Sequence, residues 1–188
     1  MAWISGNRYL SMSEMQNNAD IIHYFFKFQG WTDNAIAGML GNMQSESTIN
    51  PGIWENLTPP TGTQTNVGYG LVQWTPYTNY SNWAGSGWEN NGQKQMERII
   101  YELNNGLQWI STSKYPLSFT GFALSDATPA YLAQAWLYNY ERPGSLNQPQ
   151  RSTQANYWYE YITGQTPPTP QPEFPIWLLF KMARRGIY

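Results

Sequence analysis

One carboxylate, Glu46, stands between an apolar helical pattern and a turn signal, so its position suits acid chemistry. Apolar residues recur before it at i, i+3, i+4 and i+7, which predicts a buried helix; they are Ile36, Met39, Leu40 and Met43. Asn50-Pro51-Gly52 ends the helix, because the residue before proline avoids helical geometry. At the border of the apolar stripe and the negative end of the helix dipole, the carboxyl group is favoured in its protonated form. This predicts a general acid, and a solvated glutamate is the alternative.

The composition excludes most other catalytic machinery. The 188 residues contain no cysteine and a single histidine, His23, so a thiol nucleophile, a Ser-His-Asp triad and a His-based zinc site all lack parts. We therefore expect carboxylate chemistry with no cofactor and no metal. Charged residues are 12% of the chain and the net charge is −2, so no nucleic-acid partner is expected. Aromatic residues reach 16%, which suits carbohydrate faces as well as a large core.

Hydrophobic periodicity predicts a mainly helical domain around this glutamate. A first helix follows the capping-box spacing at Ser13 and ends near Gly30. Further helices are predicted over 93–104, from Thr128-Pro129 to Pro143, and over 150–162. The charged residues of the 93–104 helix are predicted to form a solvated face; these are Lys94, Glu97, Arg98 and Glu102.

The run from Gly68 to Trp74 has the composition of a short strand ended by Thr75-Pro76, so we expect a small strand or hairpin there. Gln73 could then offer a hydrogen bond and Trp74 a stacking face to a ligand. A flap that fills a gap in a helical core is the alternative. The predicted fold class is α+β, mainly α.

A proline-rich stretch over 165–173 is typical of a stiff linker, so we expect a domain over 1–164 and a separate segment over 174–188. That segment is too short to span a bilayer, which needs about 20 apolar residues. Its apolar anchors and following basic residues predict docking to a partner. The N-terminus lacks the apolar region of a secretory signal peptide.

Three motifs in this order resemble the phage tail lysozyme family, most closely the lysozyme domains of tail-knob proteins from short-tailed phages. They are Met39 to Gly52, Gly70 to Pro76, and Tyr140-Glu141-Arg142-Pro143, and the resemblance covers about residues 9 to 164. It implies a lysozyme-like fold with a small β-hairpin wall beside a helical lobe, with Glu46 as the general acid. It also implies substrate-binding roles for Tyr69, Gly70, Gln73, Trp74, Tyr138, Tyr140 and Glu141.

The function implied by the resemblance is hydrolysis of the MurNAc-GlcNAc β-1,4 bond of peptidoglycan glycan strands. The enzyme would sit at the tip or knob of a virion tail, held to other tail proteins through residues 174–188, and act on the host cell wall during entry. A second carboxylate would be Glu55 or Glu141; without one, a muramyl 6-hydroxyl could attack, giving a lytic transglycosylase. Two further functions stay open, namely a non-catalytic wall-binding tail module and an enzyme that lyses the host from within.

Members of that family can carry a metallopeptidase domain after the linker. This chain has only residues 174–188 there, without the ligands of such a site. We therefore expect glycan cleavage without peptide cleavage.

Overall fold

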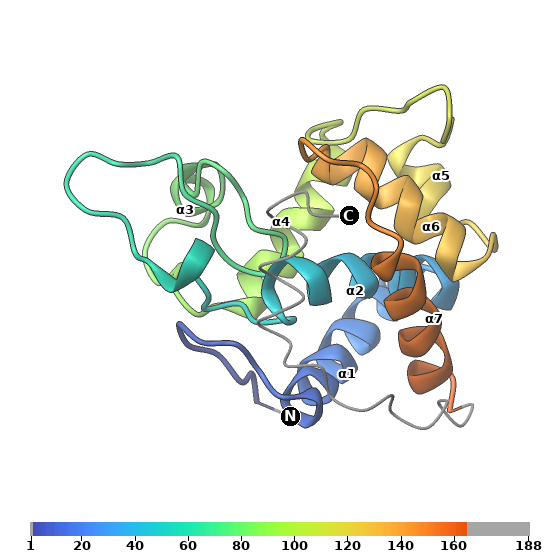
Figure 1. Ribbon diagram of the computed structural model, residues 1–188, viewed down its shortest axis with the longest axis horizontal. Coiled ribbons are helices and arrows are strands. Elements are labelled where there is room, and N and C mark those ends of the chain that lie inside the picture. The colour runs from blue at the N-terminus through green and yellow to red at the C-terminus, as the bar shows by residue number, and fades with distance from the viewer. Residues whose placement is uncertain (1, 165–188) are drawn as a thin grey trace. The chain divides into compact units, whose positions relative to one another are not determined.

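The computed structural model describes residues 2–164, and all of its regular elements are helical (Figure 1). In chain order they are α1 (Met12–Phe28), α2 (Asp33–Ser47), the 3₁₀ turn η1 (Glu55–Leu57), α3 (Thr78–Ala84), α4 (Gly92–Asn104), α5 (Phe119–Ala123), α6 (Pro129–Trp136), the π-helical turn η2 (Leu137–Glu141) and α7 (Gln150–Ile162). The predicted mainly helical character is confirmed. The predicted β-hairpin wall is wrong, because no strand forms within residues 2–164.

The chain divides into two compact units. Unit 1 contains the chain up to Gln29 together with Glu46–Trp109. Unit 2 contains Gly30–Ser45 together with the described chain from Ile110 on. Helix α2 crosses from unit 2 to unit 1 between Ser45 and Glu46, so its last turn belongs to unit 1.

The middle of α2 is buried on all sides. Every residue from Ala35 to Met43 is buried, including the apolar stripe read from the sequence. Within unit 2, glycine permits close helix packing: a Cβ at Gly41 would lie 2.6 Å from the Arg151 carbonyl oxygen of α7. Asn42 anchors the same helix, since its Nδ2 donates to the Ala133 carbonyl of α6 at 2.9 Å. Helices α6 and α7 also pack against each other.

The segment read as a strand, 68–74, is a tight turn instead. Tyr69 forms isolated antiparallel bridges with Trp54 and with Trp74, and the residues between Tyr69 and Trp74 turn back on themselves. The Gly70 backbone has a φ of 78° and Gln73 a φ of 51°, which no strand accommodates. The amide of Leu71 bonds to the side-chain Oε1 of Gln95 in α4 at 2.8 Å, in place of a neighbouring strand. A helix side chain thus satisfies the backbone that a sheet partner would satisfy.

The predicted linker over 165–173 and docking segment over 174–188 lie outside the described residues. Among the residues that are described, no helix combines the length and the hydropathy needed to cross a bilayer.

Candidate active site

Glu46 lies in the last turn of α2 and is partly exposed, between a buried helix and a buried loop. The helix ends at Ser47, before the predicted Asn50-Pro51-Gly52 stop. Thr48 and Ile49 then adopt left-handed φ values of 54° and 53°. This region is disfavoured for β-branched residues and costs about 1–3 kcal/mol per residue. The two strained residues follow Ser47, the residue after Glu46, and strain of this kind clusters at functional sites.

Buried polar groups of unit 1 hold this strained helix end in place. The buried side chain of Asn18 in α1 donates to the Ile49 carbonyl at 2.9 Å. The Thr48 hydroxyl accepts the Leu10 amide at 3.0 Å. Asn50, also buried, donates to the carbonyls of Gly6 at 2.7 Å and Arg8 at 2.6 Å. The backbone that carries Glu46 is therefore fastened to the N-terminal segment of the chain.

The turn over Gly70–Gln73 is tied to the same helix end. The Ser47 hydroxyl donates to the Leu71 carbonyl at 2.9 Å, so the residue next to Glu46 contacts the predicted substrate-binding turn. Gln73 is half-buried, and its Nε2 donates to the carbonyls of Ile53 and Gly70 at 3.2 and 3.1 Å. Unit 1 thus brings together the predicted acid and one predicted binding motif.

The aromatic members of that motif are buried. Tyr69 is 1% exposed and Trp74 5% exposed, so neither presents an open ring face. Burial raises the pKa of the Tyr69 hydroxyl to about 12, and the hydroxyl accepts the Asn90 amide at 2.8 Å. Trp74 stacks on Tyr80 with ring centroids 4.9 Å apart. Both rings therefore pack in the core and support the turn.

Glu102 of α4 is a buried carboxylate under this turn, and the sequence reading of it as part of a solvated face is wrong. It is 1% exposed, and its Oε1 accepts both the Trp74 indole N–H and the Arg98 Nε–H at 2.9 Å. The Arg98 guanidinium lies 5.6 and 5.3 Å from the ring centroids of Trp83 and Tyr101. Helical spacing alone places Glu102 beside charged neighbours. Only the tertiary position of Trp74 reveals that it faces inward.

Sequence reasoning missed a group of partly exposed aromatic residues in unit 1. Trp54 and Trp88 pack against Tyr69 with ring centroids 4.5 and 4.9 Å away. Tyr77 stacks on Trp88 at 5.7 Å, and Trp54 is edge-on to both Tyr77 and Trp88. These rings are packed against one another and stay partly exposed, which suits contact with a sugar ring. The sequence did offer a signal for them: these aromatic residues stand outside the helical patterns, so packing in a helical core does not explain why they are aromatic.

Glu55, a predicted second carboxylate, fastens a loop of unit 1. Its Oε2 accepts the Gly68 amide at 3.0 Å, just before the predicted substrate-binding turn. The sequence reading of this residue as a catalytic partner stays a prediction.

The predicted motif of unit 2 is built on the π-helical turn η2. Tyr140 is 1% exposed and stacks on Trp136 with centroids 4.2 Å apart. Glu141 is half-buried, and its Oε1 accepts the Trp136 indole N–H at 2.8 Å. Arg142 follows with a left-handed φ of 48° and ends the turn. Tyr138 keeps an exposed part, and its hydroxyl accepts a bond from Lys114 Nζ at 3.0 Å.

No group of three or more His, Cys, Asp or Glu side chains in residues 2–164 could hold a metal ion.

Comparison with known proteins supplies the family. Residues 16–162 match the phage tail lysozyme family. Morphogenesis protein 1 of Bacillus phage B103 is 48% identical to this chain over 167 residues, which are 86% of the chain and 43% of that protein. The chain therefore spans less than half the length of this curated relative. The resemblance read from the three motifs is confirmed, and the chain belongs to the phage tail lysozyme family.

Proposed function

We propose that this protein is a tail-associated lysozyme that hydrolyses the MurNAc-GlcNAc β-1,4 bond of peptidoglycan, with Glu46 as its general acid. The observation that carries the proposal is the position of Glu46: half-exposed, at the end of a buried helix, and followed by two strained residues held by buried hydrogen bonds. Strain that the surrounding structure maintains is found where the geometry of a side chain matters for function. Family membership supports the same chemistry.

In the proposed reaction the Glu46 carboxylic acid donates its proton to the glycosidic oxygen. The bond from that oxygen to C1 then breaks, and the muramyl ring acquires oxocarbenium-ion character. A water molecule attacks C1 and releases a proton to the surrounding water, which gives a reducing end, and the Glu46 carboxylate then takes up a proton from solvent to restore the acid. The Ser47 hydroxyl keeps the acid beside the Gly70–Gln73 turn, and the partly exposed rings of Trp54, Tyr77 and Trp88 provide contact surface for the sugar.

The two carboxylates considered as a second group both have structural partners. Glu55 accepts the Gly68 amide, and Glu141 accepts the Trp136 indole N–H. We therefore propose that both act mainly as positioning residues, and that the attacking water is oriented by the substrate-binding turn. Attack by the muramyl 6-hydroxyl remains the alternative outcome of the experiment below.

The test is mass spectrometry of muropeptides released from Gram-positive walls by the wild type and by Glu46→Gln. We expect reducing muramyl ends that the variant fails to release. Since general acid catalysis contributes about 10²- to 10⁴-fold, the variant should lose at least two orders of magnitude in rate. Glu97→Gln is the matched control, because Glu97 is exposed on α4.

Other products would contradict the proposal in distinct ways. 1,6-anhydro ends would establish a transglycosylase, and wall binding without products from either protein would establish a binding module. Released cross-link peptides would contradict cleavage limited to glycan. Detection of the chain in purified virions tests the tail location, whereas its absence there would favour host lysis.

A further inference from the structure

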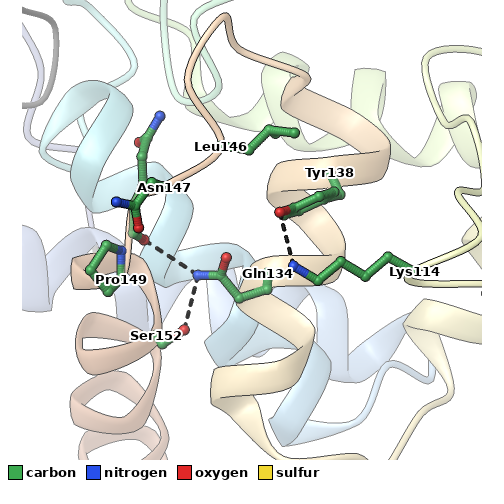
Figure 2. A pocket seen from close by; sticks show the side chains of 8 residues that line it. Lys114, Gln134, Tyr138, Leu146, Asn147, Pro149 and Ser152 are labelled. Carbon is green, nitrogen blue, oxygen red and sulfur yellow. Dashed lines mark hydrogen bonds between the residues drawn. The ribbon is translucent and has the colours of Figure 1, made fainter. Parts of the chain in front are cut away.

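Unit 2 contains a pocket of about 290 Å³ that the proposed glycan chemistry does not use (Figure 2). It lies between the loop before α7 and the start of that helix on one side, and α6 with η2 and Lys114 on the other. The lining residues are Lys114, Gln134, Tyr138, Leu146, Asn147, Gln148, Pro149 and Ser152. Its volume is at the low end for ligand sites, so a small ligand is expected.

The charge of the pocket favours an anion. None of its eight lining residues is acidic, and Lys114 at its rim is exposed and cationic. The Tyr138 hydroxyl raises the pKa of Lys114 by accepting its hydrogen bond. A second cation contacts a lining residue: buried Arg151 donates to Gln148 Oε1 at 2.7 Å.

The pocket contains hydrogen-bonding groups that remain available to a ligand. Gln134 Nε2 is occupied by the Gln148 carbonyl at 3.3 Å and the Ser152 hydroxyl at 3.0 Å. Its Oε1 accepts no bond within residues 2–164. The Tyr138 hydroxyl accepts from Lys114, which leaves its own proton to donate. An incoming ligand therefore meets two donors for an anion, with an acceptor for an N–H nearby.

The apolar parts of the lining distinguish a peptide from a sugar. Leu146 and Pro149 are the apolar side chains among the lining residues, and each suits contact with a methyl group. Lys114 Nζ lies 4.5 Å from the ring centroid of Tyr138 and covers that face, so the ring is not open for a sugar to stack on. A phosphate monoester dianion would use the donors but has no proton to donate to the Gln134 acceptor.

We propose that this pocket binds the free carboxylate end of a short peptide of small residues, as found on peptidoglycan stem peptides. Lys114 Nζ and the Tyr138 hydroxyl donate to the carboxylate, and Gln134 Oε1 accepts the last peptide N–H. Leu146 and Pro149 contact the terminal methyl group. This inference rests on the proposed function for its substrate, and it assigns unit 2 a role in recognising strands whose peptides are not cross-linked.

The test is calorimetric titration of the full chain with diacetyl-L-lysyl-D-alanyl-D-alanine and with the same peptide as its C-terminal amide. We expect the acid to bind and the amide to bind at least about tenfold more weakly, since a hydrogen bond to a charged group contributes about 1.5–3 kcal/mol. Lys114→Met should weaken binding of the acid to a similar extent. Leu146→Trp, at an exposed position, should block the pocket.

Lys27→Met is the matched control, because Lys27 is an exposed lysine of α1 in unit 1. Equal binding of acid and amide, no binding of either, or unchanged binding in Lys114→Met would overturn the inference. An enzyme that cleaves glycan but binds no peptide contradicts only the pocket assignment. A protein that binds the peptide through Lys114 but cleaves no glycan contradicts only the proposed function.

Discussion

Each of the two units contains a hydrogen bond from an indole N–H to a glutamate, and each bond involves a residue of a predicted substrate-binding motif. The surroundings of the two bonds differ. In unit 1, Trp74 bonds to Glu102 across 28 residues of sequence, and the carboxylate is 1% exposed and paired with Arg98. In unit 2, Trp136 bonds to Glu141 only five residues later, and this carboxylate is half-buried. The first bond joins separate segments through the core, whereas the second closes a local turn.

This difference predicts unequal energetic roles. A buried carboxylate that loses a partner cannot replace it with water, so the cost is large. A half-buried carboxylate can be rehydrated, so the cost is small. The unit 1 motif should therefore depend on its bond far more than the unit 2 motif does.

The strongest test is Glu102→Ala, which leaves the Arg98 cation without its carboxylate and the Trp74 N–H without its acceptor. We expect the free energy of unfolding to fall by about 3–5 kcal/mol, the usual cost of breaking a buried pair. Urea unfolding followed by circular dichroism measures it. Glu97→Ala, at an exposed position on the same helix, should change stability by less than about 0.5 kcal/mol. Equal effects of the two changes would remove the basis of the comparison.

The same substitution at each of the two indoles tests this comparison more closely. Trp74→Phe and Trp136→Phe each remove one N–H donor and a similar volume from the core. Trp74→Phe should cost about 1 kcal/mol more than Trp136→Phe, because only Glu102 is left as a buried, partly satisfied acceptor. Thermal unfolding of both variants gives the difference. A larger loss for Trp136→Phe would mean that the bond in unit 2 is the more important.

Alkaline pH probes the aromatic base of the unit 1 turn. Burial raises the pKa of Tyr69 to about 12 and also raises that of Tyr80. An unfolded tyrosine ionises near pH 10. Because the folded pKa is the higher one, the stability from keeping these hydroxyls neutral is complete below pH 10 and falls as pH rises from 10 to 12. Unfolding free energies measured across that range should decline less steeply in Tyr69→Phe, and an unchanged slope would contradict the assignment.

The smallest effect is expected for Glu141→Gln, which keeps an acceptor for the Trp136 indole. Stability should change by less than about 1 kcal/mol, because the bond is local and water reaches the side chain. Activity on walls should stay within about threefold if Glu141 is a positioning residue. A loss of two orders of magnitude in rate without loss of stability would instead identify it as the second catalytic carboxylate.

Local signals predicted much of the helical framework correctly. The cap-and-proline pair at Thr128-Pro129 opens α6, and the Gln150–Ile162 helix has the predicted bounds. Local sequence patterns gave wrong predictions where a side chain from a distant part of the chain forms the deciding contact. Gln95 satisfies the backbone of the 68–74 turn in place of a strand, and Trp74 draws Glu102 into the core.

The sequence by itself determined the helical class, the buried stripe of α2, the position of Glu46 at a helix end and the family, because these depend on residues near one another in the chain. Only the tertiary structure decided which polar groups are buried, that Thr48 and Ile49 are held in a strained conformation, and that Tyr69, Trp74 and Tyr140 support their motifs from within the core. The physical reason is that burial and hydrogen-bond satisfaction depend on distant segments, which no local spacing records.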